Sequence, residues 1–204
     1  MPPSQFRPGD PAASGAAVAK IALRDQIRTR RNRLSVAEIG SLARHLAAVV
    51  LEQPEVRRAA TVAAYVSIGV EPGTGPLLES LAVLGKRVIL PVVQPDLDLD
   101  WGTWRGASAL APAKFGLLEP ADRLGLDAVA TADVVLVPGL AVSASGARLG
   151  QGGGSYDRAL GRVPVGTPVA CLLYDEEVGI HVPTDPHDRP VTTVATPTCW
   201  LPLR

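Results

Sequence analysis

A strand, a glycine-rich loop and the start of a helix follow one another within residues 133–160, and this order constrains the fold more than any other part of the chain. Residues 134–137 form a short β-branched apolar run that Pro138 and Gly139 stop, as at the end of a buried strand. Small and turn-forming residues then lead to a predicted helix, for which Ser155 is the expected N-cap. The pattern is typical of an α/β fold.

The glycine-rich loop has the chemistry of a phosphate-binding segment. Glycines let backbone N–H groups approach an anion, and the first N–H groups of a helix lack internal partners. Arg148 adds a fork of donors that suits phosphate oxygens, and Asp157, in the first turn of the helix, is placed to hold Mg²⁺. Glycine clusters are more often flexible turns, and this one is neither a P-loop nor a clean dinucleotide-binding fingerprint. On the glycines alone, both interpretations stay open.

The complete string is more specific than its glycines. Residues 138–141 read Pro-Gly-Leu-Ala, and residues 146–158 read Gly-Ala-Arg-Leu-Gly-Gln-Gly-Gly-Gly-Ser-Tyr-Asp-Arg. This resembles the signature of the 5-formyltetrahydrofolate cyclo-ligase family, in which Pro-Gly-Leu-Ala-Phe-Asp precedes Gly-x-Arg-Leu-Gly-x-Gly-x-Gly-Tyr-Tyr-Asp-Arg. The chain departs from it where Val142 and Ser143 replace Phe-Asp and where Ser155 replaces the first Tyr. The second departure removes an aromatic wall from the expected substrate site.

Further matches to the family occur in the expected order along the chain. Lys20 and Arg24 fit an opening Lys-x-x-Leu-Arg, Glu71 begins a Glu-x-x-Thr, and Asp188 ends a His-Asp pair before the last predicted strand. The resemblance therefore covers residues 20–196. It implies an ATP- and Mg²⁺-dependent ligase that closes 5-formyltetrahydrofolate to 5,10-methenyltetrahydrofolate. The fold that it implies is a three-layer sandwich with a mostly parallel central sheet, of the sugar-phosphate isomerase and CoA-transferase type.

The resemblance also implies three groups of site residues. The ATP-binding group comprises Lys20, Arg24, Arg148, Leu149, Gly150, Gln151, Gly152, Gly153, Gly154, Ser155 and Tyr156. Lys20 and Arg148 are the expected catalytic residues of this group. The reduced folate is expected at Val66, Glu71 and Phe115, and Mg²⁺ at Asp157 and Asp188.

Several of these residues have simpler interpretations when they are taken alone. Lys20 and Arg24 share one helical face, and such a face is usually solvated. Glu71 is equally well an exposed loop carboxylate, Phe115 a core residue, and Asp188 a turn former in a proline-rich loop.

Periodicity and turn residues predict the other elements. Helices are expected at residues 18–33, 36–51 and 74–84, and a capping box at Ser35 begins the second helix. Residues 107–120 are expected to form a loop. Residues 97–104 alternate apolar and polar, which indicates an edge or antiparallel strand, and further strands are expected at residues 60–68, 88–90, 168–174 and 190–196.

Length and composition set the remaining bounds. The 204 residues, of which 47% are hydrophobic, suit one domain at residues 18–204 behind a disordered tail at residues 1–17. The net charge is zero, which argues against binding to nucleic acid or to an anionic membrane. The sequence shows neither a secretory signal nor an apolar run of the roughly 20 residues that a transmembrane helix needs. We therefore expect a cytoplasmic monomer that acts on small molecules.

Two other functions stay open at this stage. Ser155 and the pair Val142-Ser143 are compatible with a folate- or nucleotide-binding homologue that has lost turnover. Analogy at the level of the fold allows a sugar-phosphate isomerase or an enzyme of acyl-CoA chemistry.

Overall fold

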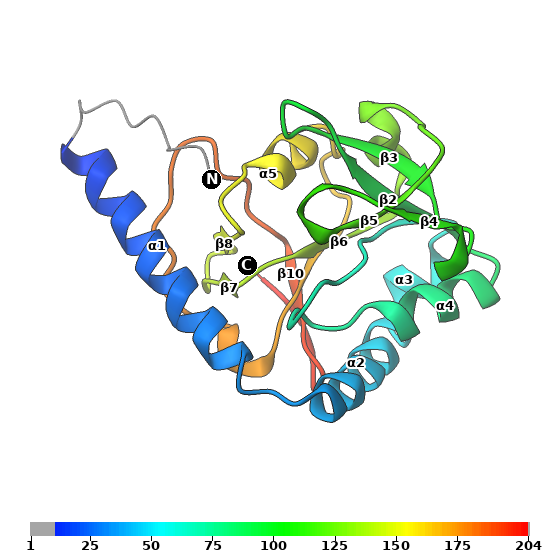
Figure 1. The fold of residues 1–204 in the computed structure, drawn as a ribbon, viewed down its shortest axis with the longest axis horizontal. Coiled ribbons are helices and arrows are strands. Elements are labelled where there is room, and N and C mark those ends of the chain that lie inside the picture. The colour runs from blue at the N-terminus through cyan, green and yellow to red at the C-terminus, as the bar shows by residue number, and fades with distance from the viewer. Residues whose placement is uncertain (1–10, 204) are drawn as a thin grey trace.

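A central seven-stranded sheet organises the computed structural model, which describes residues 11–203 (Figure 1). Its strands are β1 (Thr61–Ala63), β2 (Arg87–Val93), β3 (Leu99–Thr103), β6 (Val134–Pro138), β9 (Val169–Leu172), β10 (Thr193–Ala195) and β11 (Trp200–Pro202). The order across the sheet is β11-β10-β9-β6-β1-β2-β3. The strands from β10 to β2 run parallel, whereas β11 and β3 are antiparallel edges. The mostly parallel sheet expected from the sequence is confirmed.

Helices cover both faces of the sheet, as Figure 1 shows. They are α1 (Pro11–Arg31), α2 (Val36–Leu51), α3 (Pro54–Arg58), α4 (Gly75–Val83) and α5 (Ser155–Leu160). Successive strand residues point to opposite faces, so Val62 packs in the core with α2 and α4 while Ala63 packs in the core with α5. The predicted capping box at Ser35 is present at the start of α2. The result is the expected three-layer arrangement.

Helix α1 lies apart from these two layers. It packs through Ile27 against a two-stranded hairpin made of β7 (Ala141–Val142) and β8 (Arg148–Leu149). The helix begins at Pro11 rather than at residue 18, because Pro suits a first helical position and the alanine-rich string after it favours helix. The expected disordered tail is therefore wrong for residues 11–17, and residues 1–10 lie outside the described part of the chain.

Other boundaries differ from the expected ones for local reasons. Strand β2 continues through Pro91 instead of ending before it. Strand β1 ends opposite Ile89, so no β1 residue lies beside Pro91, and the N–H that proline lacks is not required for pairing with β1. The expected loop at residues 107–120 contains a small hairpin of β4 (Leu110–Pro112) and β5 (Leu118–Pro120). Strand β11 and helix α3 were not expected from the sequence.

Within residues 11–203, no single helix combines the length and the apolar character needed to cross a membrane. Helices α1 and α2 meet that requirement only when taken together, and they are bent by 105° at the turn between them.

Candidate active site

A cavity of about 1280 Å³ lies outside the carboxyl ends of β1 and β6, where open α/β sheets bind ligands. Every site residue expected from the sequence lines it: Lys20, Arg24, Val66, Glu71, Phe115, Arg148, Leu149, Gly150, Gln151, Gly152, Gly153, Gly154, Ser155, Tyr156, Asp157 and Asp188. Sites for one small ligand typically measure roughly 300–1,000 Å³. This cavity is large enough for two ligands side by side.

The glycine-rich loop, residues 150–154, runs along the cavity between β8 and α5. Gly152 and Gly154 have φ values of 108° and 66°, in the region that only glycine adopts without strain. Gly154 is the N-cap of α5, and the expected N-cap Ser155 is instead its first helical residue. A Cβ at Gly150 would lie 2.7 Å from Nη1 of Arg148, so a larger residue there would displace the guanidinium.

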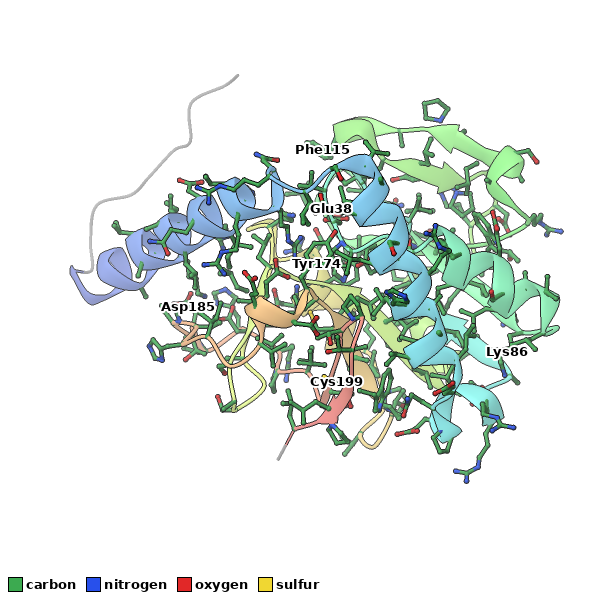
Figure 2. All side chains as sticks on the ribbon, turned by 90° about the horizontal axis from the view of Figure 1, so that it is seen from below. Glu38, Lys86, Phe115, Tyr174, Asp185 and Cys199 are labelled. Carbon is green, nitrogen blue, oxygen red and sulfur yellow. The ribbon has the colours of Figure 1, made fainter. Side chains whose placement is uncertain are left out.

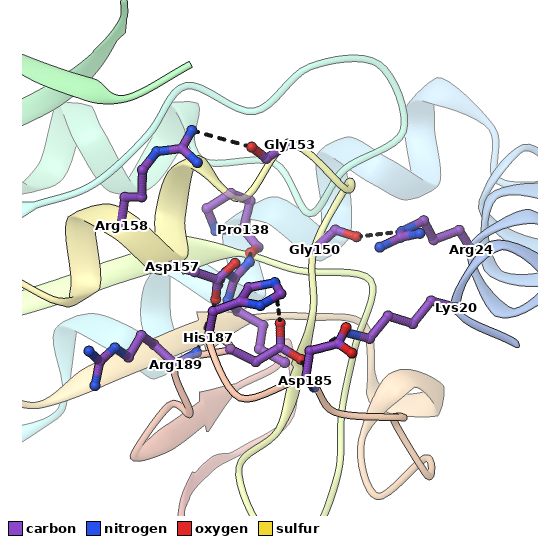
Figure 3. Close-up of polar contacts among 12 residues, drawn as sticks. Lys20, Arg24, Pro138, Gly150, Gly153, Asp157, Arg158, Asp185, His187 and Arg189 are labelled. Atoms are coloured by element: carbon purple, nitrogen blue, oxygen red, sulfur yellow. Dashed lines mark hydrogen bonds and ion pairs between the residues drawn. The ribbon is translucent and has the colours of Figure 1, made fainter. Parts of the chain in front are cut away.

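Helix α1 is tied to this loop by two arginines. Arg24 donates from Nε to the carbonyl oxygen of Gly150 at 2.9 Å, and Arg28 donates from Nη2 to Oε1 of Gln151 at 2.6 Å. Figure 3 shows Arg24 reaching across to Gly150. The loop is therefore fixed against the helix that carries the two basic residues expected to meet phosphate.

Arg148 is buried next to the loop, and one of its hydrogen-bond donors has no partner among the described residues. Its Nη1 donates to the carbonyl oxygen of Pro138 at 3.2 Å, and its Nη2 donates to Oδ1 of Asp157 at 3.2 Å. The Nε atom is buried and has no hydrogen-bond partner within the described residues. The guanidinium also lies over the Tyr156 ring, 5.7 Å from its centroid. A buried cation with an unmet donor at a cavity wall suits an anionic ligand.

Lys20 points toward Asp185 in Figure 3. Its ammonium is 2.7 Å from both Asp185 Oδ2 and Asp188 Oδ2. Burial opposes the ammonium charge, but the hydrogen bonds to the two carboxylates outweigh it and raise the pKa of Lys20 above its usual value. Burial likewise acts to raise the pKa of Asp188, but the bonds from Lys20 and from the Asp185 N–H lower it. Lys20 and Asp188 are therefore both charged at neutral pH.

The two aspartates expected to hold Mg²⁺ have different neighbours. Asp188 lies with Asp185 and His187, and one potential ligand atom from each falls within 4.8 Å of the other two. Asp157 is instead paired with Arg148 and accepts from the backbone N–H of Arg189 at 3.1 Å. Asp157 is thus hydrogen-bonded to the residue after Asp188, but it is not a member of the Asp185–His187–Asp188 cluster.

The remaining expected residues, Val66, Glu71 and Phe115, line the same cavity. The Glu71 carboxylate accepts from the Ile68 N–H at 3.1 Å and from Nε2 of Gln151 at 3.3 Å. Burial raises the pKa of Glu71 above its usual value, although these hydrogen bonds and nearby Arg31 partly oppose the shift. Phe115 is not a core residue: it is 70% exposed, and Figure 2 labels it on the outside of the small hairpin. Its ring is thus available to a ligand.

Some cavity residues were not anticipated from the sequence. Asp185, His187 and Arg189 belong to the same loop as Asp188 and reach the cavity with it. Arg158 lines the wall, where it donates to the carbonyl oxygens of Leu97 at 2.7 Å and Gly153 at 3.3 Å. The signal for Asp185 was its position three residues before Asp188, since its N–H closes a local turn onto that carboxylate at 2.8 Å.

Comparison with known proteins gives a consistent result. The profile of the 5-formyltetrahydrofolate cyclo-ligase family matches residues 16–197. The 5-formyltetrahydrofolate cyclo-ligase of Mycolicibacterium smegmatis is 46% identical over 67% of this chain and 73% of the relative. The Escherichia coli K12 protein of that name is 33% identical over 84% of this chain and 96% of the relative.

A solved structure agrees with the sequence relatives. The NMR structure of Aquifex aeolicus 5,10-methenyltetrahydrofolate synthetase superposes with a TM-score of 0.77 at 29% identity, covering 91% of this chain and 93% of that one. The likeness therefore extends to the fold of nearly the whole chain. The chain therefore belongs to the 5-formyltetrahydrofolate cyclo-ligase family.

Proposed function

We propose that this chain uses ATP to cyclise 5-formyltetrahydrofolate to 5,10-methenyltetrahydrofolate, with release of ADP and phosphate. The single observation that carries the proposal is the shared cavity. Basic side chains, the glycine-rich loop, Glu71, Val66 and Phe115 all line it. A nucleotide held by the loop and a reduced folate held by Glu71, Val66 and Phe115 would bring the γ-phosphate and the formyl group together.

The reaction needs activation more than a protein nucleophile. The γ-phosphoryl group moves to the formyl oxygen, the P–O bond to ADP breaks, and the formyl carbon becomes part of a phosphorylated imidate. The neighbouring secondary amine of the same folate then attacks that carbon. The amine loses its proton to solvent, the C–O bond breaks, and phosphate leaves with the former formyl oxygen. Because the amine is tethered to the same molecule, its effective concentration is high and the enzyme mainly activates and positions.

The cationic groups of the cavity fit this chemistry. Phosphoryl transfer depends on electrostatic stabilisation of charge on the phosphoryl oxygens. Arg148 offers a buried guanidinium with an unused Nε donor, and Lys20 and Arg24 project from α1 on the other side of the loop. We assign Lys20 and Arg148 to the transferred phosphoryl group and Arg24 to the bound triphosphate.

The acidic residues of the cavity fit a magnesium ion. Mg²⁺ prefers oxygen ligands and is usually held by one or two carboxylates together with substrate phosphates. Asp188 with Asp185 supplies such oxygens, and Asp157 supplies another beside Arg189. When bound, the ion would neutralise phosphate charge and help to align the phosphate oxygens for transfer. Cation binding at Asp185 and Asp188 would also compete with Lys20 for their oxygens and leave its ammonium for the nucleotide.

Three other residues of the cavity suit the pterin end of the folate. Phe115 presents an exposed ring for stacking, and Val66 supplies an apolar wall. The Glu71 carboxylate is positioned to accept hydrogen bonds from ring N–H groups. Ser155 leaves more room than the family's tyrosine does, so we expect Tyr156 and Phe115 to be the aromatic contacts on this chain.

We also propose that the chain acts as a single-domain monomer in the cytoplasm and binds neither nucleic acid nor membranes. The support is its zero net charge and a cavity that one chain completes by itself. Light scattering of the purified protein, with and without ligands, tests the monomeric state.

A spectroscopic assay tests the proposed activity. The methenyl product absorbs in the near ultraviolet. Purified protein mixed with 5-formyltetrahydrofolate, ATP and Mg²⁺ should therefore give a rising absorbance, and the same mixture without ATP should give none. Binding of both ligands with no absorbance change would instead identify an inactive homologue. Activity that does not require ATP would point to a different reaction.

A further inference from the structure

A buried ion pair connects α1 with the segment after β9. Arg31 donates from Nε to Oε1 of Glu177 and from Nη2 to Oε2, each at 2.7 Å. Both side chains are only 2% exposed. Arg31 also donates to the carbonyl oxygen of Gly139 at 2.7 Å, beside Pro138 in the cavity wall. With these bonds formed, the pair is a rigid, neutral unit that joins three segments.

Tyr174 is held by this pair. Its backbone N–H donates to Oε2 of Glu177 at 2.9 Å, and the Arg31 guanidinium lies over its ring, 5.4 Å from the centroid. Burial raises the pKa of Tyr174 to about 12, so its hydroxyl stays protonated and can donate. Tyr174 is buried, and Figure 2 labels it near the middle of that view. The position of its hydroxyl is therefore set by contacts on two sides.

The hydroxyl of Tyr174 reaches the segment that carries Glu71. It donates to the carbonyl oxygen of Glu71 at 3.2 Å, and the carbonyl oxygen of Val70 lies 3.4 Å away. Residues 64–74 form no helix or strand. Ser67 and Thr74 close the base of this loop by exchanging two hydrogen bonds. The Glu71 carboxylate makes its own contacts with Ile68 and Gln151. The Tyr174 hydroxyl adds a hydrogen bond from another side chain to the backbone at Glu71, and this bond holds the loop there.

We propose that Tyr174 is a positioning residue for Glu71, held in place by the Arg31–Glu177 pair, and that its hydroxyl strengthens binding of the reduced folate but not of ATP. This rests on the proposed function, in which Glu71 meets the folate. The Tyr174 ring is not among the residues that line the large cavity, so its effect on the substrate acts through the Glu71 backbone.

Tyr174→Phe tests the proposal because it removes one hydroxyl and keeps the ring. We expect the KM for 5-formyltetrahydrofolate to rise about fivefold, the loss typical of one neutral hydrogen bond. The KM for ATP should stay unchanged, and the melting temperature should fall by no more than a few degrees, as expected for the loss of one hydrogen bond. The matched control is Ser80→Ala, which also removes a hydroxyl bound to a backbone carbonyl, on α4 and away from the cavity. It should leave both KM values unchanged.

A double-mutant cycle separates positioning from a general structural role. If Tyr174 acts through Glu71, then Tyr174→Phe should add little to the folate KM in a Glu71→Gln background. Amide exchange at residues 68–71 should also quicken in Tyr174→Phe, and this measurement does not depend on turnover. An unchanged folate KM, an equal rise in both KM values, or full additivity with Glu71→Gln would overturn the inference.

The cycle also distinguishes this inference from the proposed function. If the wild-type protein forms no methenyl product, the proposed function fails, and the same four proteins are then compared by their Kd for 5-formyltetrahydrofolate. A weaker Kd in Tyr174→Phe that is lost in the Glu71→Gln background would still support the positioning role. A Kd unchanged by Tyr174→Phe would refute it.

Discussion

Lys20 on α1 and Asp188 in the loop before β10 meet at 2.7 Å, although they are 168 positions apart in the chain. The same ammonium is equally close to Asp185, so one lysine joins the first helix to the last loop of the cavity. This contact places a cation and two carboxylates next to the glycine-rich loop. Charge at this end of the cavity can therefore be redistributed when a nucleotide and a metal ion bind.

Lys20→Met should impair use of ATP, because in the proposed mechanism Lys20 is a cation that stabilises the transferred phosphoryl group. We expect kcat/KM for ATP to fall about a hundredfold, the lower range for loss of one electrostatic contact to a transition state. The matched control is Lys86→Met. Lys86 donates to the carbonyl oxygens of Arg57 and Ala59, on the other side of the molecule from Asp185 in Figure 2. Equal losses in both variants would contradict a specific role for Lys20.

Three aspartate variants identify the carboxylates that hold Mg²⁺. Asp188→Asn and Asp157→Asn should each shift the Mg²⁺ titration of activity to higher concentration by at least about tenfold, the loss seen even for groups that only support a metal ligand. Asp185→Asn then shows whether the neighbouring carboxylate shares the ion. A titration of Asp157→Asn that overlays the wild type would remove Asp157 from the site and leave the group at Asp185 and Asp188.

Activity should fall in mild acid because of Glu71. Burial raises the pKa of this carboxyl, so it takes up a proton at a higher pH than an exposed glutamate does. The protonated form accepts hydrogen bonds from the folate less well, so kcat/KM for 5-formyltetrahydrofolate should decline as the pH falls through this raised pKa. Glu71→Gln should lower kcat/KM at neutral pH and lack this acid limb. Profiles of identical shape in both proteins would argue against the role of Glu71.

Glu177→Ala should destabilise the fold strongly, because it leaves the Arg31 guanidinium buried without its partner. A loss of about 3–5 kcal/mol in the free energy of unfolding is typical for a broken buried pair. Arg30 and Glu176 supply the control, since they form an exposed pair at 3.5 Å in the adjacent positions. Glu176→Ala should cost less than about 1 kcal/mol. Chemical denaturation measures both values, and similar losses would show that the buried pair contributes no more than the exposed one.

Local sequence patterns predicted the elements whose causes are themselves local. The capping box at Ser35 set the start of α2, and the apolar run after Asp133 predicted β6. Strand β11 and the β4–β5 hairpin were missed because their short segments contain proline and lack a clear alternation. Only pairing with neighbouring segments makes them strands. The early start of α1 reflects an alanine-rich composition that was interpreted as a tail.

The candidate site shows the same division. The glycine-rich string and its resemblance to a family predicted residues that all line one cavity. The contacts between those residues depend on tertiary structure, and the sequence could not supply them. Arg31 was one basic residue among several in its helix, and Glu177 was one of two adjacent glutamates. Their burial against each other, and the link to Glu71 through Tyr174, required the folded chain.

Isotope transfer tests the central claim most directly. 5-Formyltetrahydrofolate labelled with ¹⁸O in the formyl group is converted by the protein in the presence of ATP and Mg²⁺, and the released phosphate is analysed by mass spectrometry. If the γ-phosphoryl group is passed to the formyl oxygen, each phosphate formed with the methenyl product carries one ¹⁸O atom. Methenyl product accompanied by unlabelled phosphate would contradict the account.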